Sequence, residues 1–288
     1  MLYLRRGNEM NGWNEGIRNA VEYIESHLAD EISIDEAAAN ACVSTFYFQK
    51  IFLVLCGFSV GEYIRNRRLT EAAQELCTSD IKIVDLAMKY GYDSPDSFTR
   101  AFVKFHGITP SQARNENATL NSVAPLKIKL TLIGGTKMEY KIVTKDQFTV
   151  MGISRSFNTE TSYQKISEYW TEHMQSPAGK IICGMYGICT DGDGKDFDYM
   201  IADNYLPWNE VPEGMATRVI PAGTWAVFPC HGALPKSLQD VNTKIWSEWL
   251  PSSKNYALAG NYNIEMYAPM TEDPNDYYCE IWIPVKKA

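Results

Sequence analysis

The sequence predicts a protein of two domains: an all-α domain, then an α+β domain whose strands form a curved antiparallel sheet. One helical pattern occurs twice within the first 114 residues, and a different pattern occurs twice after residue 138. Residues 115–124 between them are small and polar, which is typical of a linker. The predicted boundaries are therefore 8–114 for the first domain, 115–137 for the linker and 138–288 for the second domain.

Each copy of the N-terminal repeat predicts a short helix, a turn and a second helix. Matching residues lie 49 apart in the first helices and 50 apart from there on: Ala38/Ala87, then Ser44/Ser94, Phe48/Phe98, Phe52/Phe102 and Gly57/Gly107. The second copy therefore has one extra residue, which we place in the turn between its helices.

An uninterrupted helical pattern over residues 59–78 separates the two copies, and a helix of this length is roughly 30 Å long. A short helix, a tight turn and a second helix form a helix-turn-helix, whose second helix reads the major groove of DNA. Successive major grooves on one face of the duplex lie roughly 34 Å apart. Two copies joined by such a helix therefore predict one bipartite site on double-stranded DNA.

The outward faces of the two second helices supply the candidate DNA contacts. Gln49 can pair with adenine, and Arg100 is the best candidate for reading a guanine. The other candidates are Thr45, Phe46, Lys50, Pro95, Asp96, Ser97, Thr99 and Lys104, with Arg65, Arg67 and Arg68 on the linking helix as contacts to phosphates or acidic partners. Charges opposite an apolar stripe are usually only solvated, but Gln49 and Arg100 both lie early on the second helix of their copy.

Residues 13–114 resemble the DNA-binding domain of AraC/XylS-type transcription regulators. The matching residues are Ala38, Ser44, Ala87, Gly91, Tyr92, Ser97, Phe98, Arg100, Phe102, Lys104, Phe105 and 107–110. The resemblance implies a transcription regulator with DNA and RNA polymerase as partners. Two features depart from the pattern: Cys42 stands where the second copy has Gly91, and the whole chain has a net charge of −8.

The C-terminal half repeats at an offset of 76 residues, and each unit predicts the order strand, helix, strand, strand. The predicted elements are 138–155, 162–174, 180–189 and 197–202 in the first unit, and 216–229, 234–250, 262–267 and 278–285 in the second. Two such units can pair their strands into one curved sheet with a central cleft.

Residues 138–288 resemble the GyrI-like small-molecule-binding domain, on segments 220–228, 245–251, 264–267 and 280–285 together with Gly232. The resemblance implies a cleft for a lipophilic, often cationic, effector, with Glu265 facing the ligand and Cys189 as its counterpart in the first unit. A carboxylate among aromatic rings attracts a delocalised cation. The candidate walls are Trp170, Tyr186, Trp225, Trp246, Tyr262 and Tyr267, although each ring alone is as readily explained by core packing. Glu265 could equally point to solvent.

Two other functions stay open for the second domain: a hydrolase of reactive xenobiotics with Glu265 as general base, and a docking module that binds no small molecule. The four histidines are dispersed, with His106 and His173 expected on helix surfaces, and no Ser-His-Asp or metal-ligand pattern is present. We therefore expect no enzyme activity, no metal and no cofactor.

The seven scattered cysteines predict buried free thiols rather than a disulfide framework or a zinc site. No apolar run is long enough to span a membrane, and the first residues lack the apolar core of a secretory signal. We therefore expect a cytoplasmic protein with no membrane partner.

Overall fold

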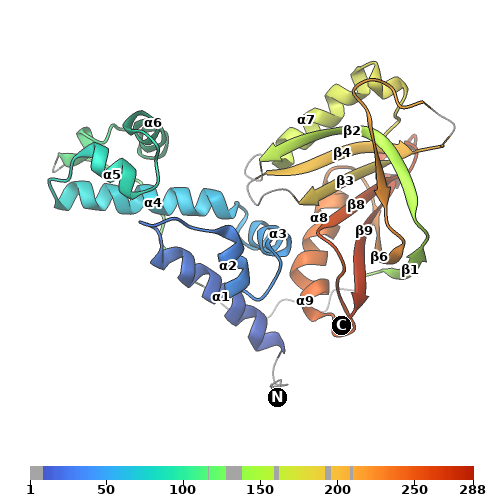
Figure 1. The fold of residues 1–288 in the computed structure, drawn as a ribbon, viewed down its shortest axis with the longest axis horizontal. Coiled ribbons are helices and arrows are strands. Elements are labelled where there is room, and N and C mark those ends of the chain that lie inside the picture. Colours follow the sequence, from blue (N-terminus) through green and yellow to red (C-terminus); the bar gives the residue numbers. More distant parts are fainter. Residues whose placement is uncertain (1–8, 116, 128–137, 159–161, 192–195, 208–209) are drawn as a thin grey trace. The chain divides into compact units, whose positions relative to one another are not determined.

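The computed structural model describes residues 9–115, 117–127, 138–158, 162–191, 196–207 and 210–288, with only the backbone for 9–14, 162–164 and 191 (Figure 1). The chain divides into two compact units, residues 1–48 with 56–131 and residues 49–55 with 132–288. The predicted linker, 115–137, lies partly outside the described residues.

The described secondary-structure elements of the N-terminal part are all helical. Its elements are α1 (Glu9–Ser26), α2 (Ile34–Asn40), α3 (Thr45–Cys56), α4 (Val60–Thr78), α5 (Ile83–Lys89), α6 (Pro95–His106) and the 3-10 turn η1 (Gln112–Arg114). The two predicted helix-turn-helix units are α2–α3 and α5–α6, with α4 as the linking helix (Figure 1). Four residues, 41–44, separate the first pair and five, 90–94, separate the second, which confirms the extra residue in the second turn.

The two helix-turn-helix turns share one backbone conformation. Cys42 has φ 57° and Gly91 has φ 75°, so both lie in the left-handed region that favours glycine. In each turn the next residue donates its N–H to a carbonyl five residues back, Val43 to Ala38 (3.1 Å) and Tyr92 to Ala87 (2.9 Å). The first turn therefore has the same conformation as the second, and Cys42 is strained because it adopts a conformation that favours glycine.

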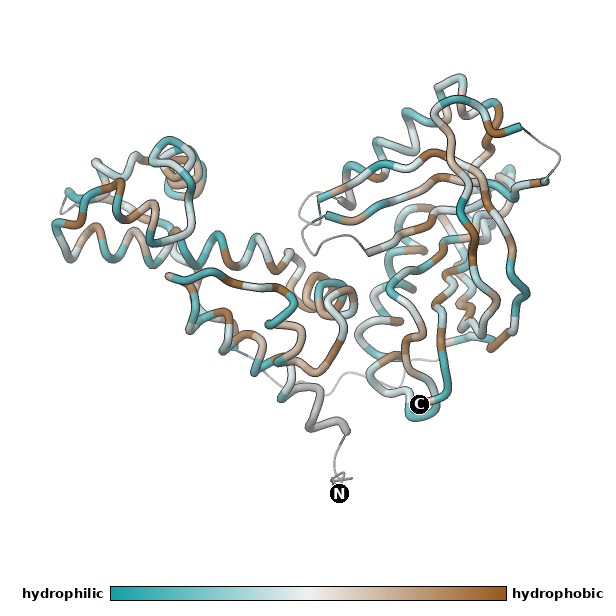
Figure 2. Tube along the Cα trace, in the orientation of Figure 1, coloured by the Kyte–Doolittle hydropathy of each residue, from teal (hydrophilic) through white to brown (hydrophobic). Residues whose placement is uncertain are grey.

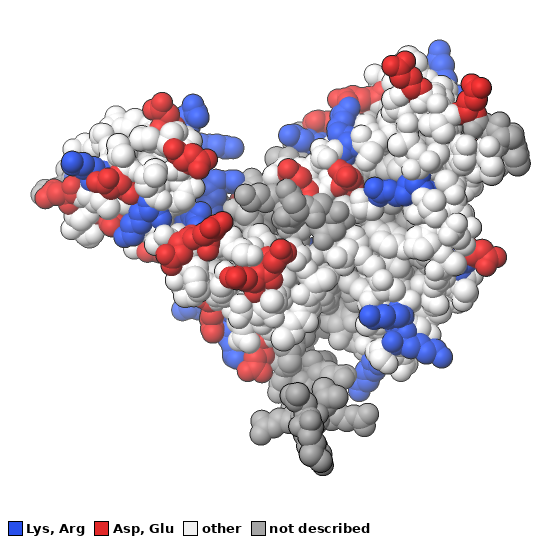
Figure 3. Space-filling model, viewed as in Figure 1, with Lys and Arg blue, Asp and Glu red and all other residues white. Residues whose placement is uncertain are grey.

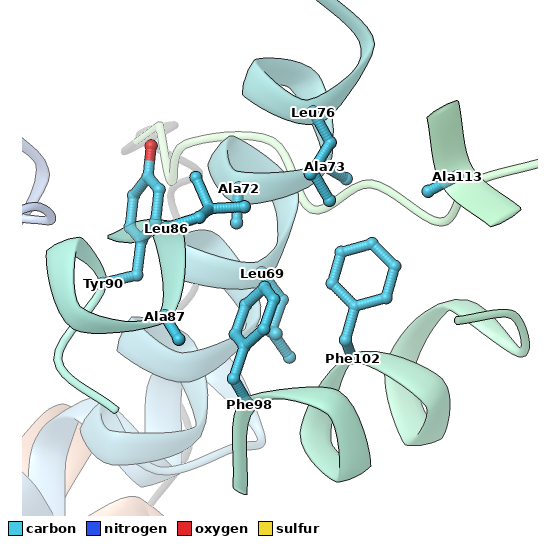
Figure 4. Packing of buried hydrophobic residues seen from close by; sticks show 10 residues of the cluster. All are labelled: Leu69, Ala72, Ala73, Leu76, Leu86, Ala87, Tyr90, Phe98, Phe102 and Ala113. Carbon is cyan, nitrogen blue, oxygen red and sulfur yellow. The ribbon is translucent and has the colours of Figure 1, made fainter. Parts of the chain in front are cut away.

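The second helix-turn-helix encloses a compact apolar core, in which Phe98 and Phe102 of α6 pack between α4 and α5 (Figure 4). These rings lie four residues apart, so they fall on one face of the helix and leave the opposite face to solvent. The buried cluster consists of Leu69, Ala72, Ala73, Leu76, Leu86, Ala87, Tyr90, Phe98, Phe102 and Ala113. Figure 2 shows hydrophobic positions alternating with hydrophilic ones along these helices.

The C-terminal part is a sheet of nine described strands with helices on one face. Its elements are β1 (Lys141–Lys145), β2 (Phe148–Asn158), α7 (Ser162–Gln175), η2 (Ala178–Lys180), β3 (Tyr186–Asp191), β4 (Asp196–Asn204), β5 (Ala216–Ile220), β6 (Gly223–His231), α8 (Lys236–Lys244), the π-helical segment η3 (Ile245–Trp249), α9 (Leu250–Ser252), β7 (Tyr256–Leu258), β8 (Tyr262–Tyr267), η4 (Pro274–Asp276) and β9 (Tyr278–Lys287). The strand order is β1-β6-β9-β8-β3-β4-β2-β5, with β7 also pairing to β9.

The first strand of each repeat unit pairs with a strand of the other unit. Each predicted first strand, 138–155 and 216–229, is in fact two strands, interrupted at 146–147 and at 221–222. Pro221, which has no N–H to donate, marks the second break. β1 pairs with β6 of the second unit, whereas β5 pairs with β2 of the first unit.

These short connections also curl the sheet. The segment 146–147 joins β1 at one end of the strand order to β2 near the other, and 221–222 joins β5 and β6 in the same way. Two-residue connections can span such a distance only if the two ends of the sheet come together. The inner face of the curl is packed with Val150, Tyr186, Ile188, Met200, Ala202, Ile220, Trp225, Val227, Ile264 and Trp282.

The helices cover the face of the sheet opposite this inner face, as the register of the strands shows. Phe228, Ile281, Glu265, Gly187 and Ile201 form one row across β6, β9, β8, β3 and β4. The rings of Phe228 and Trp249, the last residue of η3, lie 4.9 Å apart, so this row lies on the helix-covered face.

Two expectations about single residue types were wrong. His106 and His173 are buried rather than on helix surfaces, since each Nε2 lies within hydrogen-bonding distance of a backbone carbonyl, at 3.1 and 2.8 Å. The described cysteines are free, but only Cys189, Cys230 and Cys279 are fully buried, whereas three others are exposed.

Among the described residues, no single helix is long and apolar enough to cross a membrane. One pair, α2 with α3, meets the length and composition together but is bent by 83° between them.

Candidate nucleic-acid interface and effector site

The exposed face of α6 carries a row of charged side chains. Asp96, Arg100 and Lys104 follow at four-residue intervals, so they share the face opposite Phe98 and Phe102, and all three are exposed. Figure 3 shows acidic and basic side chains interspersed on the visible face of the helical unit. DNA contacts on the exposed face of α6 would therefore be made by single residues rather than by a uniformly basic surface.

The remaining α6 candidates shape the start of the helix. Pro95 occupies the first turn, and Ser94 caps the helix by accepting the N–H of Ser97 at 3.2 Å. The Ser97 hydroxyl donates back to the Ser94 carbonyl at 2.8 Å, while Thr99 is half-buried. Ser97 therefore also serves the cap, and a role in DNA contact stays a prediction for Pro95, Ser97 and Thr99.

The candidates on α3 are less exposed than expected. Thr45 donates its hydroxyl to Asp35 at 2.6 Å, and Gln49 and Lys50 are half-buried. Phe46 is only 2% exposed, although an outward side chain was expected. Residues 46–48 are all buried, and three successive residues cannot share one helix face, so α3 is buried on more than one side.

The arginines of α4 serve the fold. Arg67 is 4% exposed and forms ion pairs with Glu25 (2.8 Å) and Glu71 (2.7 Å). Arg68 donates to the backbone carbonyls of Leu28 and Asp30. Arg67 therefore pairs with acidic side chains of its own unit and Arg68 with backbone carbonyls, whereas Arg65 is half-buried and its contact to phosphate stays a prediction.

The segment after α6, expected to be a simple linker, is bound to the same helices. Arg67 donates to the carbonyl of Val123 at 2.7 Å, and Val123 donates its N–H to Thr70 at 3.0 Å. The hydroxyl of Tyr63 accepts the N–H of Leu126 at 2.9 Å and donates to Glu25 at 2.6 Å. The buried Arg67–Glu25 pair therefore anchors both the helices and residues 123–126.

In the sheet unit, the candidate effector site is centred on Glu265 of β8. Its Oε2 accepts hydrogen bonds from the hydroxyls of Tyr199 on β4 (2.6 Å) and Tyr267 on β8 (2.8 Å). Trp170 of α7 donates its Nε1–H to the Tyr199 oxygen at 3.0 Å, and its ring lies 5.0 Å from that of Tyr267. Both of these hydrogen bonds fall on Oε2, and the charge of Lys50 also acts on the carboxyl group of Glu265.

Two glycines let these side chains approach the backbone. A Cβ atom at Gly187 would lie 2.0 Å from the Tyr199 hydroxyl oxygen and 2.9 Å from Oε2 of Glu265. A Cβ atom at Gly184 would lie 2.4 Å from the ring of Trp170. Sequence reasoning did not single out Tyr199, Gly184 or Gly187, although an isolated glycine within a strand is a recognised sign of close approach.

Burial sets the protonation of this cluster. It raises the pKa of Glu265 above its ordinary value, because the loss of solvent outweighs the hydrogen bonds from Tyr199 and Tyr267 that favour the carboxylate. Burial and the neighbouring carboxylate raise the pKa values of both tyrosines, so their hydroxyls stay protonated donors. Burial therefore disfavours the charged form of Glu265, and a cationic neighbour favours it.

The other predicted walls lie elsewhere. Trp246 is fully buried and donates to the side chain of Asn242 at 2.9 Å. Tyr186, Trp225 and Tyr262 belong to the inner face of the sheet, opposite Glu265. The structure thus brings together Glu265, Trp170 and Tyr267 of the predicted set, and leaves the other four rings outside the cluster.

Within the described part of the chain, no group of three or more His, Cys, Asp or Glu side chains is placed to hold a metal ion.

Comparison with known proteins identifies both units. Residues 141–285 match the family model of the integron-associated effector binding protein, and residues 37–116 match a helix-turn-helix domain model. The transcriptional regulator Rob of Salmonella typhimurium is 27% identical over 290 residues, covering 94% of this chain and 98% of Rob. The HTH-type transcriptional activator AarP of Providencia stuartii is 35% identical over 114 residues, covering 40% of this chain and 84% of AarP.

Among solved structures, SAV2435 bound to tetraphenylphosphonium covers 52% of this chain and 94% of its own, with 22% identity and a TM-score of 0.44. An integron cassette protein of Vibrio cholerae is also similar to this chain, at 20% identity and a TM-score of 0.40 over 51% of this chain and 95% of that one. The chain belongs to the integron-associated effector-binding protein family, and its N-terminal helices make it an AraC-type helix-turn-helix transcription regulator with a GyrI-like effector-binding domain.

Proposed function

We propose that the effector of this regulator is a lipophilic, cationic aromatic molecule bound at Glu265. One observation carries the proposal: two tyrosine hydroxyls hold one oxygen of a half-buried carboxylate, and Trp170 donates to one of these hydroxyls. Such a carboxylate is ordered before the ligand arrives and still has an acceptor to offer.

The chemistry of the cluster selects the charge of the ligand. A delocalised cation can lie against the faces of Trp170 and Tyr267 and neutralise Glu265, whereas an anion would be repelled by the same carboxylate. A neutral aromatic compound would gain apolar contact but no charge interaction. We therefore expect cations to bind more tightly than uncharged compounds of the same shape.

At the DNA, we assign base reading to Arg100 and phosphate contact to Lys104 on the exposed face of α6. RNA polymerase is the second macromolecular partner in this proposal. The exposed Val84 and Met88 of α5 are the candidate contact surface for it, since apolar side chains this exposed often mark protein interfaces.

The test is a tryptophan-fluorescence titration of the full chain with tetraphenylphosphonium and with tetraphenylborate, which share their shape and differ in charge. Glu265→Gln removes the charge, and Glu272→Gln removes an exposed carboxylate outside the cluster as a control. We expect selective binding of the cation, weakened about tenfold or more by Glu265→Gln alone, because a tenfold loss equals about 1.4 kcal/mol of charge interaction.

Equal binding of the anion, or unchanged binding by Glu265→Gln, contradicts the proposal. Consumption of the ligand during the titration would favour the hydrolase that the sequence left open, which none of the comparisons supports. A folded protein that binds neither compound would favour a docking module.

A further inference from the structure

The inner face of the curled sheet carries a cavity that the effector site does not use. Its volume is about 260 Å³, and it is lined by Lys145, Asp146, Phe148, Tyr186, Asn204 and Trp282. Side chains alternate along β8, so Glu265 lies on one face of the sheet while Ile264 and Met266 pack with this inner cluster. The cavity and the Glu265 site are therefore on opposite faces.

Three aromatic rings form the wall of the cavity. Ring centroids lie 5.9 Å apart for Phe148 and Tyr186, 5.8 Å for Tyr186 and Trp282, and 6.5 Å for Phe148 and Trp282. The rings are tilted or edge-on to one another rather than stacked face to face. We call these three residues the aromatic box.

A buried carboxylate fixes the orientation of Trp282. Glu280 accepts the indole N–H of Trp282 at 2.6 Å, and also the hydroxyl of Tyr278 at 2.6 Å and the ammonium of Lys141 at 3.0 Å. Burial alone would raise the pKa of Glu280, but these three hydrogen bonds lower it below its ordinary value. The box is thus rigid at Trp282 and backed by a negative charge.

The box already contains a cation. Nζ of Lys145, the last residue of β1, lies 3.9 Å from the centroid of the Trp282 ring. A lysine ammonium over an indole face is a cation–π contact, the interaction by which aromatic cages recognise quaternary ammonium groups. The lysine stem is flexible, so this ammonium can leave the box without any movement of the backbone.

We propose that the aromatic box is a second small-molecule site, for a compact organic cation such as a methylated ammonium, and that Lys145 occupies the position of the ligand's ammonium group. A volume of about 260 Å³ is below the usual range of roughly 300–1,000 Å³ for drug-sized ligands, so the ligand is small. Asp146 at the cavity favours positive charge, whereas Glu280 behind Trp282 is already paired with Lys141. The exposed side chain of Asn204 leaves the cavity open to solvent.

The test is calorimetric titration of the full chain with tetramethylammonium chloride, with sodium benzoate as the anionic probe. Lys145→Met keeps the stem but removes the competing ammonium, and Lys286→Met removes an exposed lysine elsewhere as the matched control. We expect Lys145→Met to bind tetramethylammonium at least threefold more tightly than the unmodified chain, and Lys286→Met to bind as the unmodified chain does.

Two further variants locate the site. Phe148→Leu in the Lys145→Met background removes one wall of the box and should abolish the gain, whereas Lys286→Met in the same background should keep it. The proposal is overturned if Lys145→Met brings no gain, if Phe148→Leu leaves the gain intact, or if benzoate binds and is lost in Lys145→Met, which would make Lys145 an anion ligand.

Discussion

Gly187 on β3 lies directly across from Glu265 on β8, and the hydroxyl of Tyr199 occupies the space that a side chain at Gly187 would fill. Gly187→Ala should therefore displace Tyr199 from Glu265 and destabilise the sheet unit by about 1–3 kcal/mol, the usual cost of overpacking. Gly223→Ala is the matched control, because nothing lies within 4 Å of a Cβ atom there. Urea unfolding of both variants measures the difference, and equal stability would contradict this account of Gly187.

Cys42 adopts the left-handed conformation that Gly91 adopts in the second turn. Cys42→Gly should stabilise the helical unit by about 0.5–1 kcal/mol, since relief of the strain exceeds the entropic cost of glycine. Gly91→Ala should have the opposite effect, because its Cβ atom would also lie 2.6 Å from the Arg68 guanidinium. Denaturant midpoints measure both changes. Loss of stability in Cys42→Gly would show that the cysteine side chain makes a compensating contact.

Burial lowers the pKa of His106 below its ordinary value of 6.5, although the hydrogen bond to the Leu69 carbonyl opposes the shift. The unfolded chain therefore binds a proton more readily than the folded chain. His106 should contribute full stability above about pH 6.5, and that contribution should decline as the pH falls below this value. The urea concentration at the midpoint of unfolding should fall less steeply in His106→Gln than in the unmodified chain as the pH is lowered from 8 to 5. A slope in His106→Gln as steep as that of the unmodified chain would contradict this account of His106.

The Arg67–Glu25 ion pair is buried and also holds residues 123–126. Arg67→Ala should destabilise the helical unit by about 3–5 kcal/mol, because it leaves Glu25 without its cation. It should also speed tryptic cleavage at Lys127. Arg18→Ala removes an ion pair whose arginine is 56% exposed and should cost at most about 1 kcal/mol. Equal effects of the two changes would show that the buried pair does not anchor the segment.

Arg100 and Lys104 should affect DNA binding differently if their proposed roles are right. Arg100→Ala should cost about 1–3 kcal/mol on the specific site and relax the preference at one base position. Lys104→Ala should weaken binding similarly for all DNA sequences. It should also reduce the slope of the logarithm of the binding constant against the logarithm of the salt concentration by about one. Affinities for specific and scrambled duplexes at several salt concentrations separate the two roles. A uniform loss in Arg100→Ala would reassign it to phosphate contact.

The helical unit could be predicted well because its signals are local. The caps at Ser33, Ser59 and Ser94 and the glycine positions all act within a few residues of themselves. The repeat in the second half was also informative, since Ile188 and Ile264, 76 residues apart, are register partners. The crossing of β1 and β5 could not be predicted, because the pattern of a strand indicates its buried face but not its neighbour.

The Glu265 site was predicted only in part, because the spacing of residues in the sequence relates residues of one strand but not residues of different strands. Glu265 and Tyr267 lie on one strand with a period of two, so their shared face follows from the sequence. Tyr199 meets them from β4, two strands away, and no spacing in the sequence relates it to Glu265. Tyr186, Trp225 and Tyr262 were grouped with the site because they are aromatic, whereas the alternation of the strands assigns them to the opposite face.

The crossing of β1 and β5 makes the two repeat units dependent on each other. A fragment ending after β4 would keep β1 without β6 and β2 without β5, so it would expose unpaired strand edges. The arrangement is equivalent to a homodimer that exchanges its first strands and is then joined into one polypeptide. Joining removes the requirement that both halves carry the same sequence. One half can therefore present Glu265 where the other presents Cys189, and a pseudo-symmetric scaffold can hold a ligand that has no symmetry.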